Sequence, residues 1–320
     1  MQVCLPHLTP ESFRAHPLHH PDRHWPETNC YIDLWIEVLH ALGLPPEPAM
    51  AIAARQDFEG DQFSFTKIPL EDIETLYGLY VQELALYDPV DIHVARQMER
   101  GRLCLVEVDP FWLPDTGQAA YRREHAKTTI GVNRLDRDNG QLEYFHNAGY
   151  FSLGEEDFRG LFPQSGGSQL QLRPYVEYAT LEIQTLPVSE LRARGQQLLD
   201  HAWARRPASN PIRRYQTALP ELAEALVGRE AHAFHDHAFH FPRLLGSNFE
   251  LLAACLEWLS EGADPRVACC LEIAAAAKAL PLHLAKALAR KRFDGLSRVL
   301  DPAADAWDAL FDAAPSRVAA

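Results

Sequence analysis

The residue with the clearest capacity for chemistry is Cys30, which stands where a helical pattern begins. In the segment CYIDLWIEVLHALG apolar residues recur every three or four positions, Asn29 is suited to cap the helix start, and Gly43 ends the pattern. Unpaired backbone N–H groups and the helix dipole favour an anion at such a position, so they would stabilise a nucleophilic thiolate. A small residue packed on the apolar face of the helix would occupy the same position. Position alone therefore leaves both interpretations open.

A cysteine nucleophile needs a general base, and His125 is the candidate, at the start of an expected strand. The segment HAKTTIGVNRLDRDNGQLEYFHNAGYF has the composition of a β-hairpin. If the hairpin is centred on Asp136, Asn147 lies opposite His125 and can orient the imidazole, as in a Cys–His–Asn arrangement. A two-residue Asn-Gly turn would instead place Gly154 opposite His125. The pattern leaves both registers open.

The segments around these residues indicate an α+β front and an all-helical back. The run Leu103–Val108 suits a buried strand that ends at an Asp-Pro pair, and YVEYATLEIQTL is typical of another strand. Asp109 and Asp115, on either side of FWLP, are alternative partners for the candidate histidine. Beyond these strands the Ala- and Leu-rich sequence has helical spacing. We therefore expect an α+β domain over residues 1–187 and a helical domain over residues 188–320.

Composition and charge argue against several classes of protein. The 320 residues are 47% hydrophobic and 23% charged, as in globular proteins, and the net charge of −14 argues against nucleic-acid binding. No apolar run reaches the ~18 residues of a membrane span, and the first residues lack the basic and apolar regions of a secretion signal. The six cysteines form no CxxC pair, which argues against a disulfide framework. We expect a cytoplasmic protein.

Two histidine-rich segments and one acidic segment raise the question of metal binding. HPLHHPDRH and HAFHDHAFH can cluster imidazoles, but neither has an HExxH pattern or paired cysteines. DFEGDQF places Asp57, Glu59 and Asp61 at alternate positions but lacks the glycine and glutamate positions of a calcium loop. We expect no bound metal.

Several of these motifs together resemble known families. NCYIDLWIEVLHALG, DFEGDQFSF, VEVDPFWLPDT, YRREHAKTTIGV and YFHNAGYF resemble a bacterial family of unknown function. Its members are associated with gene clusters for amino acid:carrier-protein ligases, which look like truncated seryl-tRNA synthetases. This resemblance covers about residues 22–160. More distantly, the start of the Cys30 helix, the VEVDPFWLP strand and the His125 strand resemble the N-terminal domain of the butirosin-biosynthesis acyltransferase. That enzyme is papain-like and moves an acyl group from a carrier-protein thioester to an amine.

The resemblance implies a papain-like α+β fold and assigns roles to the candidate residues. Cys30 would be the nucleophile and His125 the general base and acid. Asn147 would orient the histidine, at a position where papain-like transferases often carry Asp. The resemblance therefore favours the hairpin register in which Asn147 lies opposite His125. His24 lies six residues before Cys30, where papain-like enzymes commonly have an oxyanion-hole Gln, so the backbone N–H of Cys30 is the expected oxyanion donor. The other candidates for orienting or oxyanion roles are Asp109 and Asn29.

The function implied by the resemblance is that of an acyl or aminoacyl transferase. The donor would be a thioester on the phosphopantetheine arm of a carrier protein, and the acceptor a small-molecule or protein amine. No cofactor would be bound to the protein itself. The alternatives are a cysteine hydrolase (thioesterase, amidase or peptidase) and a non-catalytic protein that binds the carrier protein.

A surface that docks a carrier protein would be basic, because carrier proteins are typically acidic. Two groups of basic residues are candidates for such a surface. The first, around His125, is Arg122, Arg123 and Lys127, and the second, in KALARKR, includes Lys286 and Arg290. A solvated helix face is the alternative interpretation of the second group.

Overall fold

A computed structural model describes residues 1–163 and 173–312, and they form two compact units. Unit 1 comprises Met1–Pro17, Asn29–Pro45 and Leu70–Leu186. Unit 2 comprises Leu18–Thr28, Pro46–Pro69 and Pro187–Ala320. The last segment of unit 2 begins at Pro187, which the sequence analysis placed as the last residue of the front domain. Two segments of the front half nevertheless belong to unit 2, which no pattern in the sequence predicted.

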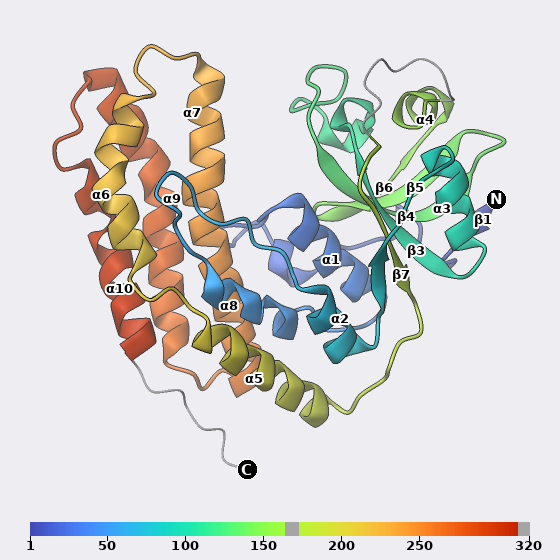
Figure 1. Ribbon diagram of the computed structural model, residues 1–320, viewed down its shortest axis with the longest axis horizontal. Helices are drawn as coiled ribbons and strands as arrows, with labels where there is room; N and C mark the ends of the chain where they lie inside the picture. Colours follow the sequence, from blue (N-terminus) through green and yellow to red (C-terminus); the bar gives the residue numbers. More distant parts are fainter. Residues whose placement is uncertain (164–172, 313–320) are drawn as a thin grey trace. The chain divides into compact units, whose positions relative to one another are not determined.

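Unit 1 is built on an antiparallel sheet (Figure 1). The strand order is β2-β7-β3-β4-β5-β6, and β1 pairs with β4 outside this path. The strands are β1 (Gln2–Val3), β2 (Val81–Glu83), β3 (Arg102–Val108), β4 (Thr128–Asp136), β5 (Gln141–His146), β6 (Gly149–Leu153) and β7 (Val176–Thr180). The expected α+β class with an antiparallel sheet is therefore present.

The register of β4 and β5 differs from both pairings considered from the sequence. Gly131 faces Phe145, whereas a hairpin centred on Asp136 would have placed Phe145 opposite residue 127. The connection is a four-residue loop, residues 137–140, and a bulge between Val132 and Arg134 shifts the pairing once more. The expected single hairpin also contains a second turn, so that it forms three strands.

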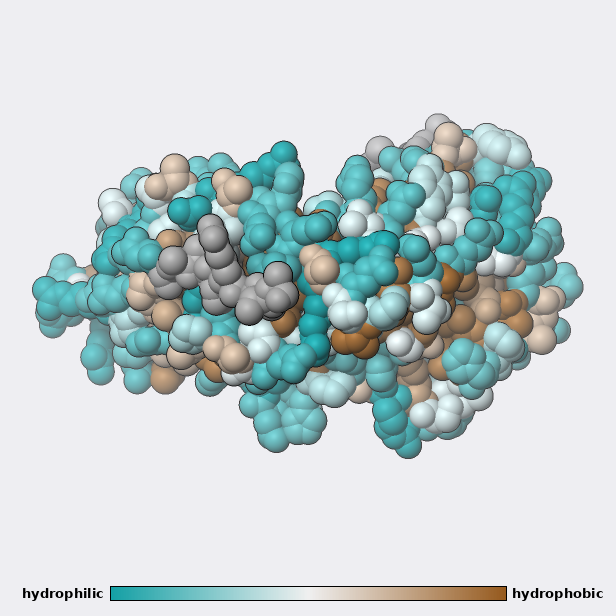
Figure 2. Space-filling view, turned by 90° about the horizontal axis from the view of Figure 1, so that it is seen from below, coloured by the Kyte–Doolittle hydropathy of each residue, from teal (hydrophilic) through white to brown (hydrophobic). Residues whose placement is uncertain are grey.

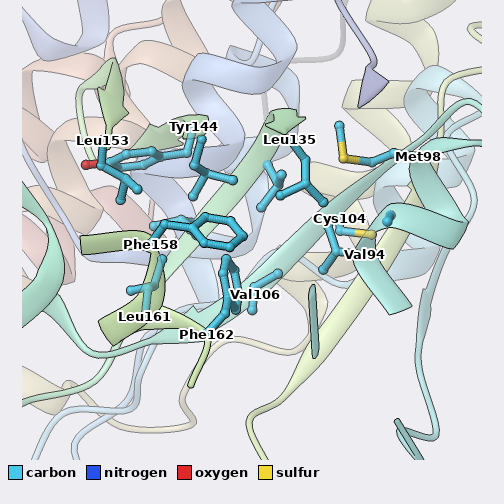
Figure 3. Close-up of a cluster of buried hydrophobic side chains, with 14 of the residues drawn as sticks. Val94, Met98, Cys104, Val106, Leu135, Tyr144, Leu153, Phe158, Leu161 and Phe162 are labelled. Atoms are coloured by element: carbon cyan, nitrogen blue, oxygen red, sulfur yellow. The ribbon is translucent and has the colours of Figure 1, made fainter. Parts of the chain in front are cut away.

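Four α-helices accompany the sheet: α1 (Cys30–Ala41), α2 (Leu70–Tyr77), α3 (Val90–Met98) and α4 (Glu155–Leu161). Helix α1 packs against β4 so closely that a Cβ on Gly131 would lie 3.1 Å from Leu34 Cδ1. Ile130 and Val132, the neighbours of that glycine, belong to a core cluster with α3 and α4. Successive strand residues point to opposite faces, so α1 covers one face of the sheet and the cluster covers the other (Figure 3).

Helix α1 forms where the sequence predicted it, and its burial explains its composition. The Asn29 side chain caps it by accepting hydrogen bonds from the backbone N–H groups of Tyr31 and Ile32. Almost every position from Tyr31 to Leu39 is buried, which requires more than one apolar stripe. The buried Glu37 carboxylate accepts the backbone N–H of His16, so this acidic group is not left without a donor.

Unit 2 is helical. Its α-helices are α5 (Val188–Ala204), α6 (Pro211–Glu224), α7 (Ala231–Ala238), α8 (Leu244–Ser260), α9 (Arg266–Arg290) and α10 (Asp301–Asp312). A π-helical turn, Phe239–Arg243, joins α7 to α8, and the 3-10 helix Glu47–Arg55 packs on α5 and α8. The helical C-terminal region expected from the sequence is therefore present.

The two early segments of unit 2 are integral to its core. The Trp25 indole donates to the backbone carbonyl of Ala274 in α9, and the Glu250 carboxylate of α8 accepts the backbone N–H groups of His24 and Trp25. Phe58 packs its ring against that of Tyr215 at a centroid distance of 5.3 Å. These contacts bury chain from the front of the sequence among the helices of the back.

One helix, α9, is long and apolar enough to meet the length and composition test for a membrane span, which the sequence analysis did not anticipate. Core helices meet the same test, and Leu280 and Leu284 of α9 are fully buried, although only 33% of the apolar window of this helix is buried. Exposed large hydrophobic side chains, such as Phe65 and Leu282, are scattered. The face drawn in Figure 2 mixes hydrophilic and hydrophobic residues.

Candidate functional site

The Cys30 thiol lies at the first position of α1 and faces a polar group. Its Sγ is 3.9 Å from Thr129 Oγ1, near the start of β4. The residue is half-buried, whereas Cys104, Cys255 and Cys270 are fully enclosed. Burial raises the pKa of each of those three thiols, which keeps them protonated. The helix start, the partial exposure and the hydroxyl neighbour distinguish Cys30 from a cysteine that only fills a core.

His125 is held by a carboxylate and an aromatic ring. Its Nδ1 lies 2.6 Å from Asp109 Oδ2, and its ring stacks on Phe111 at a centroid distance of 4.3 Å. The other oxygen of Asp109 accepts a hydrogen bond from the backbone N–H of Phe111. One carboxylate therefore contacts both the His125 ring and the backbone of the residue on which that ring stacks. When the carboxylate accepts from Nδ1–H, Nε2 carries the lone pair that a general base needs. His125 lies three residues before β4 and not within it.

The side chain that contacts His125 Nδ1 is that of Asp109, which the sequence offered as an alternative, and not that of Asn147. The structure places Asn147 in the turn between β5 and β6, where its φ of 44° suits a tight hairpin turn. The expected pairing of Asn147 with His125 depended on a register that the loop after Asp136 and the bulge in β4 do not allow.

The antiparallel pairing of β3 and β4 brings these groups to one end of the sheet. Val108, the last residue of β3, faces Thr128, the first residue of β4. Asp109 follows that pair on one strand, and His125 precedes it on the other. Thr129, which contacts Cys30, is the next residue of β4. A thiol, an imidazole and a carboxylate far apart in the sequence thus gather around the first residues of β4.

A second histidine–aspartate pair lies on the opposite face of the sheet. His146 Nδ1 is 2.6 Å from Asp115 Oδ2, and His146 Nε2 is 2.8 Å from Thr128 Oγ1. The Tyr144 hydroxyl donates to the other oxygen of Asp115 at 2.5 Å. Burial, together with Asp115, raises the pKa of Tyr144 and keeps it a donor. Asp115, the other alternative partner for His125, is thus engaged here instead.

Sequence reasoning missed this buried network. The signal that was present is the alternation of strand side chains, which places Thr128 and Thr129 on opposite faces. Through Thr128, the network anchors the start of β4 from the face opposite Cys30.

The remaining predicted residues have separate positions. His24 belongs to unit 2, where its backbone N–H binds Glu250. Arg122 forms ion pairs with Asp157 and Glu156 and lies over the Trp112 ring, while Arg123 is exposed. Lys127 forms an ion pair with Glu107. These contacts already engage two of the three basic residues that surround His125.

Lys286 and Arg290 lie on the exposed side of α9 and line a hollow of about 520 Å³. His283 and Arg292 also line the hollow, and Asp294 contributes one carboxylate. Within the described ranges, no carboxylate forms an ion pair with Lys286 or Arg290. The hollow is therefore a basic surface in a protein of net charge −14.

Within residues 1–163 and 173–312, no group of three or more His, Cys, Asp or Glu side chains is arranged to hold a metal ion. Asp57, in the acidic segment, forms an ion pair with Arg214. In the histidine-rich segment of α7, His237 is buried against Tyr215, its Nε2 lying 3.2 Å from the phenol oxygen.

The fold and the site define an α+β protein in which a cysteine at a helix start contacts β4 and a histidine–aspartate pair lies where β3 ends and β4 begins. The model of the DUF1839 N-terminal domain matches residues 14–181, and that of the DUF1839 C-terminal domain matches residues 188–315. The chain therefore belongs to the DUF1839 family, a two-domain family of unknown function. No curated protein matches it.

Proposed function

We propose that this protein is a papain-like cysteine acyltransferase that takes an acyl or aminoacyl group from a carrier-protein thioester. The observation that carries the proposal is the 2.6 Å contact between Asp109 and His125 at the end of the sheet where Cys30 begins α1. A thiol at a helix start beside an imidazole that a carboxylate orients is the arrangement used for nucleophilic catalysis. The resemblance of the motifs to the butirosin-biosynthesis acyltransferase supports the same assignment.

In the first half-reaction the Cys30 thiol gives its proton to His125 Nε2, and the thiolate attacks the thioester carbonyl carbon. The backbone N–H of Cys30, one of the unpaired donors of the first turn of α1, stabilises the oxyanion. The bond from the carbonyl carbon to the pantetheine sulfur then breaks, and that sulfur takes the proton from His125. The products are an acyl-Cys30 thioester and the free carrier thiol.

In the second half-reaction a neutral amine attacks the acyl-Cys30 carbonyl and gives a proton to His125. The bond to Cys30 Sγ breaks, the sulfur recovers a proton from the imidazolium, and an amide is released. Both half-reactions start from a thioester, which is already activated. The site therefore has to exclude water more than it has to activate the carbonyl. Cys30, His125 and Asp109 supply all the groups required, and the phosphopantetheine arm enters as substrate and not as a bound cofactor.

The carrier protein would dock on a basic surface. Because Arg122 and Lys127 are engaged with carboxylates, the hollow lined by Lys286 and Arg290 is the better supported of the two candidate surfaces. All six cysteines are free thiols, which supports the cytoplasm as the compartment.

Intact-mass measurement tests the proposal directly. After incubation with an aminoacylated carrier protein, the wild type should gain the mass of one acyl group, and Cys30→Ala should gain none. His125→Ala should slow the appearance of the adduct by roughly 10²–10⁴-fold. Addition of an amine should discharge the adduct as an amide. A wild type that never gains mass would contradict the proposal and favour a non-catalytic protein that binds the carrier.

One observation favours a cysteine hydrolase as the second candidate. The His125 side chain is 70% exposed, so water has access to the general base. On the same Cys30 and His125, water would then replace the amine in the second half-reaction. Release of free acid at one rate across a panel of amines, with no amide formed, would establish hydrolysis.

A further inference from the structure

Glu107 lies opposite the strand residue that contacts the candidate nucleophile. It faces Thr129 across the β3–β4 pair, and Thr129 is the residue whose hydroxyl contacts Cys30 Sγ. Cβ atoms of directly opposed strand residues are about 5 Å apart and project from the same face. The Glu107 carboxylate therefore stands one side chain away from the thiol, on the face of the sheet that α1 covers.

The Glu107 carboxylate already binds a primary ammonium group. Lys127 Nζ is 2.9 Å from Glu107 Oε1, and the lysine comes two residues before Thr129 in the chain. The Lys127 side chain is 61% exposed, while that of Glu107 is only 28% exposed. An exposed lysine pair of this kind contributes about 0–1 kcal/mol, so a ligand can displace the lysine at little cost. The Glu107 backbone, by contrast, is held between two neighbouring segments, because it pairs with Thr129 and its N–H donates to the carbonyl of Tyr175.

We infer that Glu107 binds the protonated amino group of an aminoacyl thioester, with the Lys127 ammonium in its place when no substrate is bound. This inference rests on the proposed function and narrows its substrate class from acyl to aminoacyl donors. In an α-aminoacyl thioester the amino nitrogen is two bonds from the carbonyl carbon that Cys30 attacks. An ammonium held at Glu107 would therefore bring that carbonyl towards the thiol.

The chemistry favours the donor over the acceptor as the group that Glu107 holds. A carboxylate at contact distance stabilises the charged form of an amine. An attacking amine must be neutral, so a carboxylate that keeps it protonated would oppose the second half-reaction. The amino group of the donor takes no part in bond making, and its positive charge can be used for recognition.

Two donors of equal size test the inference: glycyl-pantetheine thioester, which carries an ammonium, and propionyl-pantetheine thioester, which carries a methyl group instead. The rate of Cys30 acylation is measured by intact mass for each donor. The wild type should prefer the glycyl donor, and Glu107→Gln should lower the glycyl rate by roughly 10- to 100-fold without changing the propionyl rate. Lys127→Met, which removes the competing ammonium, should raise the glycyl rate.

Glu143→Gln is the matched control. Glu143 also lies on a strand, is 21% exposed and pairs with a cation, Arg134, at 3.0 Å. It should change neither rate. Equal rates for the two donors in the wild type, or an equal loss for both in Glu107→Gln, would overturn the inference and leave the proposed function standing. A wild type that accepts neither acyl group, whether it is presented on pantetheine or on a carrier protein, would defeat the proposed function, and the inference with it.

Discussion

Two histidine–aspartate pairs stand on opposite faces of the same sheet and differ in almost nothing except their surroundings. In each pair a carboxylate oxygen lies 2.6 Å from the histidine Nδ1. The His125 side chain is 70% exposed, and that of His146 is 2% exposed. His146 Nε2 contacts Thr128 Oγ1, whereas no hydrogen bond within residues 1–163 and 173–312 engages the Nε2 of His125. A histidine–aspartate pair alone therefore does not define an active site. The group next to the second ring nitrogen of the histidine decides what the pair can do.

Replacing the exposed carboxylate should cause the largest change in activity. Asp109→Asn would let His125 adopt the wrong tautomer, because an amide can donate to Nδ1 as well as accept from it. We expect the rate of Cys30 acylation to fall on the order of a hundredfold, with the free energy of unfolding changed by no more than about 0.5 kcal/mol. Single-turnover mass measurement and urea denaturation check the two halves. A large loss of stability would mean that the exposed pair is structural after all.

The equivalent change in the buried pair should act on stability instead. Asp115→Asn leaves at least one buried donor, either His146 Nδ1–H or the Tyr144 hydroxyl, without an acceptor. A buried polar group left without a partner costs about 1–3 kcal/mol, and urea denaturation should show a loss of that size. The acylation rate measured well below the denaturation midpoint should fall less than in Asp109→Asn. The opposite ranking of the two variants would reverse the assignment of the two pairs.

A third histidine, His237 in unit 2, extends the comparison to a buried ring whose Nε2 contacts the Tyr215 hydroxyl and not a carboxylate. Burial lowers the pKa of His237 to about 4, with His240 nearby adding to the effect. Between about pH 4 and the ordinary value of 6.5 the unfolded chain binds a proton that the folded chain does not. The free energy of unfolding should therefore rise with pH across this window.

Urea titrations from pH 4.5 to about 7 measure that rise, and His237→Gln is the test of its origin. Other groups titrate in the same range, so the difference between variant and wild type is the informative quantity. An unchanged pH dependence in His237→Gln would show that the buried ring is not its source.

The smallest expected effect is at the helix cap. Asn29→Ala removes the acceptor for the backbone N–H groups of Tyr31 and Ile32 and should cost about 1 kcal/mol of stability. Asn29→Asp keeps the acceptor and should retain the stability of the wild type. If neither variant differs from the wild type in urea, the side chain of Asn29 is not what holds the start of α1.

The sequence predicted those features that depend on neighbouring residues. Helix α1 and its cap follow from the spacing after Asn29, and β3 follows from an apolar run with an Asp-Pro end. Asp109 was found as an alternative because it stands at that end. The register of β4 and β5 was not predictable in the same way, since it depends on which residues form the loop, 137–140, and on a bulge between Val132 and Arg134 that shifts the pairing by one residue.

Features that join distant parts of the chain were beyond sequence patterns. The contact of Asp115 with His146 depends on how the strands between them fold. Nothing in the local sequence around either residue indicates that the two side chains meet. The assignment of two front segments to unit 2 was equally impossible to predict from the sequence. Nothing in the composition of Leu18–Thr28 or Pro46–Pro69 separates them from their neighbours.

The presence of front segments in unit 2 has a consequence for anyone who expresses the two halves of the protein separately. A cut at residue 187 looks natural, yet it would remove Trp25 and Phe58 from the helices that enclose them. The back fragment would lose part of its own interior, and the front fragment would carry orphaned apolar segments. Co-expressed halves should reassemble through those segments, whereas either half alone should aggregate.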